Sequence, residues 1–456
     1  MPRLSSRGHT EQGFMSISPT FRPWDPTSYH FVILWSDVLV IATYDYFCGM
    51  QKPQQRPQFE FVAIMASLMS IVALAIDALL PAMATIGASV NSFDPTDNQK
   101  LITMIFLGLG VGELVLGPLS DSFGRKALVY FGFAVFGVAS LICVMAPSLE
   151  WMLFGRVLQG IGLSAPRSIS ISMIRDSYKG DYMARIMSFV TAFFILVPIV
   201  APAIGKFSLD HSGWESIFYV QLIATFFVVF WFWRRQPETL RPEYKIKFSF
   251  RMYLDGLKEV LRYRETIAFT LVSGLITGAF MVYLSAAQQI FEDQYGLAED
   301  FPFIFAGLAV SVGLSTLMNG TLVVKLGMRR LALIALTLFC AISVTYVALF
   351  WNTSNPSLGI LLTFLALQFF TLGFLFGNFK AIAMEPIGHI AGMGSALTGF
   401  VATLVAIPIA TYVGSFIGET SVPLFMGFSA CGIISLLIFM GVRGRFSTKY
   451  LVQSIK

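Results

Sequence analysis

Four ionisable side chains lie inside long apolar runs of a sequence in which only 12% of the residues are charged. They are Asp77, Glu113, Arg156 and Arg167. A charge at the centre of a membrane-spanning helix costs about 2.5 to 3.5 kcal/mol, so such residues indicate function by default. Carboxyl groups at membrane depth can carry protons, and arginines pair with them. We therefore predict that Asp77, Arg156 and Glu113 take part in proton coupling.

The depth of each charge along its expected helix predicts the pairs. With a rise of about 1.5 Å per residue, Asp77 lies ~24 Å from the start of its helix and Arg156 ~8 Å from the opposite surface, which places them at a similar depth. An acid whose arginine moves away can release and regain a proton. The alternative is a permanent ion pair that only holds two helices together. The same arithmetic predicts a second pair, Glu113 with Arg167, although Glu113 could instead face an aqueous vestibule.

A second concentration of charge occupies the segment "GPLSDSFGRK" at residues 117–126, between two apolar runs. Glycine permits tight turns and close approach of helices, and charges on a short connection can pair when helices meet. Gly117, Asp121, Gly124, Arg125 and Lys126 are therefore candidate functional residues of this connection.

The apolar runs themselves predict the fold. Hydrophobic residues make up 56% of the 456 positions, and a membrane-spanning helix needs about 20 consecutive, mostly apolar residues. We predict an all-α membrane protein with twelve transmembrane helices in a lipid bilayer. The expected spans are residues 61–86, 101–120, 127–146, 151–174, 186–205, 216–233, 266–290, 301–324, 331–351, 358–379, 391–415 and 422–442.

Lysine and arginine gather in the connections that follow the even-numbered spans. Nine of them lie between Arg234 and Arg264, whereas the connections after the odd-numbered spans hold only Lys100 and Lys206. Because cytoplasmic loops carry the excess of basic residues, both termini are expected in the cytoplasm. Lys380 is counted here with the connection after the tenth span.

The twelve spans divide into two pseudo-symmetric halves of six. The expected division is an N-terminal half at 59–233, a central cytoplasmic loop at 234–265, a C-terminal half at 266–442 and a cytoplasmic tail at 443–456. The segment "GTLVVKLGMRR" at 320–330 repeats the glycine spacing of residues 117–126, with Val324 in place of the acid. This echo favours a repeat of six helices with the substrate handled between the halves, and a generic tight turn is the alternative.

Residues 1–58 are expected to form a cytoplasmic or interfacial extension. The apolar run 31–50 is long enough to span, but Asp37 and Asp45 would be costly inside a membrane. An extra membrane segment, or a true start at Met50, remain open alternatives. In the central loop, "FSFRMYLDGLKEVLRY" predicts an amphipathic helix on the inner leaflet, or else a solvated linker helix.

Further candidates for lining a substrate cavity are polar residues within the second half. These are Gln288, Gln289, Gln368 and Asn378, with Arg167 from the first half. Polar groups among apolar walls suit an uncharged or amphipathic ligand, although interhelical hydrogen bonds are the common alternative. The histidines and cysteines are dispersed, so we predict no metal or other cofactor. The sequence has no nucleophile motif, so we do not predict an enzyme. The basic residues follow the orientation rule for membrane proteins, so we predict no binding of nucleic acid.

Residue by residue, Gly117, Leu119, Asp121, Gly124, Arg125 and Lys126 resemble the signature loop of the major facilitator superfamily. "GRVLQGIG" at 155–162 resembles the fourth-helix motif of its proton-coupled drug exporters, with Arg156 as the motif arginine. "IDALLPAMATIG", "MIRDSY" and "GWESIF", with "AAQQIF", "KLGMRRL" and "AMEPIGHIAG" in the second half, are similar to the Bcr/CflA-type drug/proton antiporters. The resemblance covers residues 58–445.

This resemblance implies proton-coupled efflux of drugs or other small amphipathic molecules across the cell inner membrane, by a monomer that works by alternating access. It also implies that the signature loop forms a cytoplasmic gating latch, in which Asp121 holds the two halves together and Arg125 bridges to Asp176. The latch residues are then Gly117, Asp121, Gly124, Arg125, Lys126 and Asp176. The sequence departs from the family in two places. The antiporter motif of the fifth helix has glycines on both sides of its proline, whereas here Ala201 precedes Pro202 and Lys206 follows Gly205. Glu113 stands where a neutral polar residue is expected. These departures leave symport open, and a transporter of a specific metabolite such as an amino acid is the alternative function.

Overall fold

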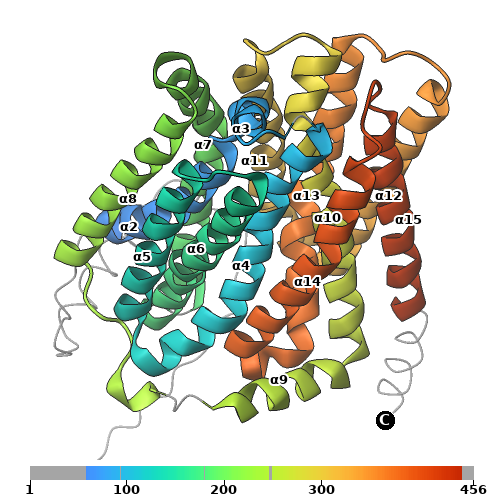
Figure 1. Cartoon of the computed structure of the whole chain (residues 1–456). Coiled ribbons are helices and arrows are strands. Elements are labelled where there is room, and N and C mark those ends of the chain that lie inside the picture. The colour runs from blue at the N-terminus through green and yellow to red at the C-terminus, as the bar shows by residue number, and fades with distance from the viewer. Residues whose placement is uncertain (1–57, 93, 179, 246–248, 444–456) are drawn as a thin grey trace, which may run out of the picture. The chain divides into compact units, whose positions relative to one another are not determined.

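The computed structural model describes residues 58–92, 94–178, 180–245 and 249–443, and the described chain is helical throughout (Figure 1). The predictions for the N-terminal extension and the C-terminal tail therefore fall almost entirely outside the described residues. Twelve helices have membrane length. They are α2 (Gln58–Asp77), α4 (Pro95–Phe123), α5 (Arg125–Val144), α6 (Leu149–Ser177), α7 (Gly180–Ser212), α8 (Glu215–Arg235), α10 (Arg264–Gln288), α11 (Phe301–Leu326), α12 (Met328–Phe350), α13 (Leu358–Met384), α14 (Ala391–Gly414) and α15 (Val422–Arg443).

Each of the twelve predicted spans coincides with one of these helices, which confirms the all-helical fold. Shorter helices fill the connections: η1 (Leu80–Ala82), α3 (Met83–Ser89), η2 (Pro242–Tyr244), α9 (Phe250–Arg262), η3 (Gln289–Gln294) and η4 (Glu385–Ile390). The first span is broken after Asp77, just before Pro81, because proline has no N–H to continue a helix. The tenth span runs five residues further than predicted, to Met384.

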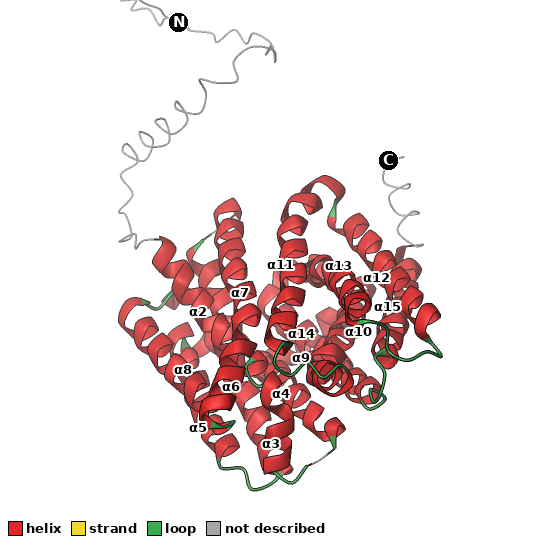
Figure 2. Cartoon of the chain, turned by 90° about the horizontal axis from the view of Figure 1, so that it is seen from above, coloured by secondary structure: helices red, strands yellow, loops and turns green. Residues whose placement is uncertain are grey.

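By length and composition, nine helical segments of the described residues could cross a membrane. One of them joins α13 and α14 through η4, and α6 and α7 are not among the nine. Helix α6 contains three arginines and a serine-rich stretch, which lower its hydropathy. In the view of Figure 2, α2, α5, α6, α7 and α8 lie on one side and α12, α13 and α15 on the other. Helices α4, α10 and α14 pack together where these groups meet.

Glycines set the close packing and the turns. A side chain at Gly108 of α4 would collide with the backbone of Val157 in α6, so these two helices approach as only small residues permit. Gly124 has a φ of 106° and joins α4 directly to α5, and Gly327 has a φ of 77° and joins α11 to α12. Both turns need glycine, because other residues rarely adopt a positive φ. The echo seen in the sequence is thus a shared backbone turn.

The predicted amphipathic helix is α9, which lies at one end of the bundle (Figure 1). Its apolar residues Leu254, Leu257 and Leu261 are exposed, and the Tyr253 hydroxyl donates to the carbonyl oxygen of Val115 at 3.4 Å. We call this the α9 end of the molecule and the opposite one, which carries α3, the α3 end.

Candidate functional site

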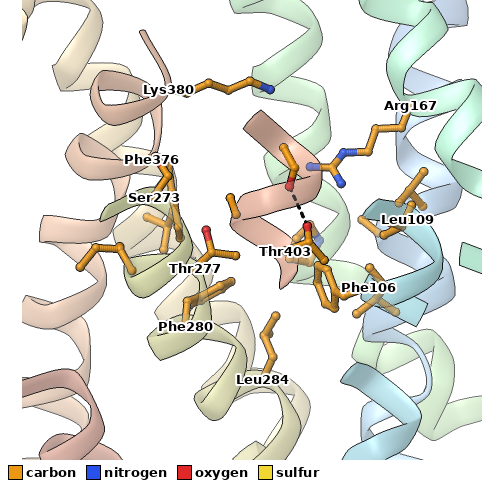
Figure 3. Close-up of a pocket in the computed structure, with 18 of the residues that line it drawn as sticks. Phe106, Leu109, Arg167, Ser273, Thr277, Phe280, Leu284, Phe376, Lys380 and Thr403 are labelled. Carbon is orange, nitrogen blue, oxygen red and sulfur yellow. Dashed lines mark hydrogen bonds between the residues drawn. The ribbon is translucent and has the colours of Figure 1, made fainter. Parts of the chain in front are cut away.

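A cavity of about 460 Å³ lies between the first six and the last six helices. Residues of α2, α4, α6 and α7 line it on one side, and residues of α10, α11, α13 and α14 on the other. Its walls are mainly apolar and aromatic, with Phe106 and Leu109 facing Phe280, Leu284 and Phe376 (Figure 3). This size and lining are typical of sites for drug-sized molecules.

Asp77 is the last residue of α2 and lines this cavity. Its side chain is buried, with 6% of its surface exposed, and forms no hydrogen bond or ion pair in the described part of the chain. Tyr283 of α10 lies near enough to interact electrostatically with Asp77, and its hydroxyl is buried without a hydrogen-bond partner. An acid of the first six helices and a phenol of the last six therefore line the same cavity.

The predicted ion pair between Asp77 and Arg156 is absent from the described structure, which corrects that expectation. The fully buried Arg156 donates instead to the carbonyl oxygens of Leu101 at 3.0 Å and Ala75 at 3.2 Å, and to Oε1 of Gln159 at 2.8 Å. The carbonyls in the last turn of a helix lack partners within the helix, and a cation there is favourable. Arg156 thus holds the end of α2 two residues before the carboxyl group.

The second predicted pair is present. Nη1 of Arg167 lies 3.3 Å from Oε1 of Glu113, and both residues line the cavity. Lys380 lines it as well, from α13, which corrects our placement of this lysine in a connection and the absence of charge from the last six spans. The signal available in the sequence was that Lys380 directly follows the apolar run "FLFGNF", so a helix that continues for one more turn includes it.

Arg125 is the centre of the predicted latch. Its buried guanidinium lies 2.6 Å from Oδ1 of Asp121 and 3.0 Å from Oδ2 of Asp176, and it donates to the Ser120 hydroxyl at 2.6 Å. The Thr239 hydroxyl also donates to Asp176, at 3.2 Å. The pairing of Arg125 with Asp176, which the resemblance implied, is therefore present in the geometry.

Asp121 also faces the last six helices. Its Oδ2 lies 3.9 Å from where a Cβ atom of Gly392 would stand, in the first turn of α14. The N-terminus of a helix carries partial positive charge, so a carboxylate is stabilised there. Asp121 of α4 thus lies beside the first turn of α14 at the α9 end.

Two other members of the predicted latch act differently from our expectation. The ammonium of Lys126 lies 5.9 Å from the ring centre of Tyr130 and 5.8 Å from that of Phe232, which are cation–π distances. Nothing lies within 4 Å of a Cβ position at Gly117, so close approach does not explain that glycine.

Sequence reasoning missed Glu238, which follows α8. Its carboxylate accepts hydrogen bonds from the backbone N–H of Lys126 at 3.0 Å, Leu240 at 3.0 Å and Thr239 at 2.8 Å. Burial opposes the charge of Glu238, but these backbone donors together lower its pKa below the usual value. Glu238 stands far from the signature segment in sequence, so no local pattern marks it.

The four amide candidates do not line this cavity. Gln368 donates to the Phe339 carbonyl at 3.3 Å, and Asn378 donates to Oδ1 of Asn319 at 2.8 Å. Gln288 accepts from the backbone N–H of Ala84 at 3.2 Å, and Gln289 accepts from Gln99 at 3.0 Å. These amides therefore form hydrogen bonds between helices, which was the alternative to a role in the substrate cavity.

The two sets of helices are thus joined at both ends of the cavity. At the α3 end, Gln99 of α4 donates to Gln289 and, at 3.2 Å, to the Gly414 carbonyl of α14. Lys206 of α7 lies 3.1 Å from Glu299, which precedes α11. Contacts between the two sets of helices therefore lie at both ends of one central cavity.

A family comparison decides the class of this protein. Residues 64–411 match the model of the Major Facilitator Superfamily. The chain belongs to this superfamily. As a member of the Major Facilitator Superfamily it is a multi-pass membrane transporter of small molecules and not an enzyme. Among the described residues, no group of three or more His, Cys, Asp or Glu side chains could hold a metal ion.

Individual relatives agree with the superfamily. The chain is 26% identical over 401 residues to a bicyclomycin resistance protein homolog of Haemophilus influenzae, covering 86% of this chain and 98% of that one. It is 23% identical over 393 residues to the multidrug resistance protein MdtL of Salmonella paratyphi B, covering 84% and 95%. The crystal structure of a D-xylose-proton symporter superposes with a TM-score of 0.66 at 13% identity, covering 84% of this chain and 96% of that one.

Proposed function

We propose that this transporter exports drugs or other small amphipathic molecules in exchange for protons, across the cell inner membrane and as a monomer. In this proposal both termini are cytoplasmic, so the α9 end faces the cytoplasm. The N-terminal half is 59–233, the C-terminal half is 266–442, and the central loop is 234–265. The relatives named for bicyclomycin and multidrug resistance support export of this kind.

The observation that carries the proposal is the place of Asp77. It is an acid without an ion-pair partner in the described chain, and it lies on the wall of an aromatic cavity between the halves. A carboxyl group in a cavity that opens alternately to each side exchanges its proton with each side in turn. Because the substrate would occupy the same cavity, its binding and the protonation of Asp77 are coupled.

The other residues support this cycle. Arg156 positions Asp77 by holding the carbonyl of Ala75 at the end of α2. The bonds from Arg125 to Asp121 and Asp176, with Asp121 at the first turn of α14, close the α9 end. Opening that end requires α4 to move away from α14 and the Asp121 contact to break. Glu113 and Arg167 also line the cavity, and in this proposal their ion pair rearranges when the substrate binds.

Proton movement in inside-out vesicles tests the proposal. After acidification of the vesicle interior, an exported compound should dissipate the proton gradient in the wild type. Asp77→Asn should abolish this effect, because an amide cannot carry the proton, while ligand binding to purified protein stays within about threefold. Gradient dissipation by Asp77→Asn at the wild-type rate would exclude Asp77 from the proton path. Transport of a single amino acid, with no response to drugs, would favour the metabolite transporter instead.

A further inference from the structure

Two cationic side chains reach into the cavity from opposite halves. Arg167 extends from α6 and Lys380 from α13, and their charged ends point toward the space between these helices (Figure 3). Arg167 pairs with Glu113 at 3.3 Å. Lys380 is exposed to this space and forms no hydrogen bond or ion pair in the described part of the chain. One cation of the cavity therefore lacks a counter-charge in direct contact.

The charges at this part of the cavity do not balance. Lys380 interacts electrostatically with Glu113 and Arg167, so two cations share one carboxylate. Asp77 forms no ion pair with either cation in the described part of the chain, so it does not correct this imbalance. An unpaired charge away from bulk water is unfavourable, and an anion placed beside it offsets the cost. Arginine and lysine both form strong, charge-assisted hydrogen bonds with carboxylates.

The remaining wall defines the rest of the ligand. Phe106, Phe280 and Phe376 present aromatic surface to the cavity, whose volume of about 460 Å³ suits a drug-sized molecule. A fitting occupant has one negative charge and an apolar, aromatic body. At this part of the cavity a cationic ligand would meet Glu113, which already pairs with Arg167, so the charges there favour an anion.

We propose that the cavity binds amphipathic organic monoanions, with a carboxylate placed between Arg167 and Lys380 and an apolar body against the phenylalanines. This inference rests on the proposed function and names the class of substrate for it. The anion and the proton occupy separate parts of the cavity, so they compete through the conformational cycle and not for one site. Exchange of one monoanion for one proton moves two charges across the membrane, and both follow an inside-negative potential.

Binding of three fluorescent probes to the purified full-length protein, without any gradient, tests the inference. Dansyl-phenylalanine is a carboxylate, dansyl-phenylalaninamide is its neutral counterpart, and dansylcadaverine is a cation of the same type. We expect the carboxylate to bind about tenfold more tightly than the amide, which corresponds to one charge-assisted contact. Tighter binding of the amide or of dansylcadaverine overturns the inference, and so does a wild type that binds none of the three.

Variants assign the preference to its residues. Lys380→Gln should weaken the carboxylate about tenfold and the amide less than twofold, and Lys380→Arg should keep the preference. Lys325→Gln is the matched control, because Lys325 is an exposed lysine of α11 that does not line the cavity. Equal weakening of both probes by Lys380→Gln would mean that Lys380 only shapes the cavity, which overturns the inference.

A third variant should bind the carboxylate probe more tightly than the wild type does, which a misfolded protein would not do. Glu113→Gln removes the carboxylate that competes for Arg167, so dansyl-phenylalanine should bind severalfold more tightly while the amide is unchanged. Weaker binding of the carboxylate to this variant contradicts the inference. These assays need no proton coupling. A carboxylate preference without proton exchange would therefore refute only the proposed function, and proton exchange without that preference would refute only the anion site.

Discussion

The contacts at the two ends of the cavity differ in their chemistry. At the α9 end, Arg125 lies between the carboxylates of Asp121 and Asp176, and Asp121 faces the first turn of α14. At the α3 end, the Gln99 amide bonds the Gln289 amide and the carbonyl of Gly414, while the ion pair of Lys206 with Glu299 lies at the surface. Ionic networks respond to salt and pH, whereas amide hydrogen bonds at neutral pH do not. The two ends should therefore respond differently to the same conditions.

This difference suits an exchanger that must keep one side closed while the other opens. A charged network stabilises the closed state strongly only while all of its members are present, because removal of one partner leaves an uncompensated charge. The amide bonds contribute about 0.5 to 1.5 kcal/mol each and can be exchanged for water bonds at small cost. We expect the α9 end to set the main barrier of the cycle.

Removal of the shared arginine should have the largest effect. Arg125→Gln leaves Asp121 and Asp176 without their cation, and we expect a loss of about 3 kcal/mol in closure of the α9 end. Transport should fall below about a tenth of the wild type. A cysteine placed at Ser273 in the cavity wall should react faster with a membrane-impermeant maleimide added from the α9 side. The control is Arg251→Gln on exposed α9, and equal labelling in the two variants would refute the latch.

Loss of the amide bonds at the α3 end should have an intermediate effect. Gln99→Leu leaves the Gly414 carbonyl and the Gln289 amide oxygen without their donor, which should cost about 1 to 3 kcal/mol in closure of this end. The cysteine at Ser273 should then react faster from the α3 side, and a rise in salt from 0.1 to 1 M should not change that rate. A strong salt dependence would show that charges, such as the exposed Lys206–Glu299 pair, also close this end.

The smallest effect is expected at Glu238. Backbone donors hold its pKa below that in the unfolded chain, so its stabilising contribution is present above the usual glutamate pKa of about 4.3 and is lost as the pH falls through the folded value. Glu238→Gln should reduce stability by about 1 kcal/mol at pH 7, because the group is partly exposed to solvent. Thermal unfolding in detergent from pH 7 to pH 3.5 measures this. The gap between variant and wild type should narrow below pH 4.3, and a constant gap would contradict the assigned role.

Several parts of the fold and the site were predictable from the sequence because each depends on neighbours along the chain. Twelve apolar runs predict twelve helices, since a helix satisfies its own backbone in lipid. The turn at Gly124 follows from the freedom of glycine at positive φ. The depths of Glu113 and Arg167 were sufficient to predict their ion pair.

Other features were decided only by the tertiary structure. Rise along a helix gives depth but not rotation, so Arg156 shares a depth with Asp77 and yet bonds to the carbonyls at the end of α2. One extra turn of α13 carries Lys380 from a predicted connection into the cavity, opposite Arg167. Tyr283 and Glu238 gain their importance from partners far away in the chain. The sequence by itself determined the helices and the charges available, whereas helix rotation and packing decided which of them meet.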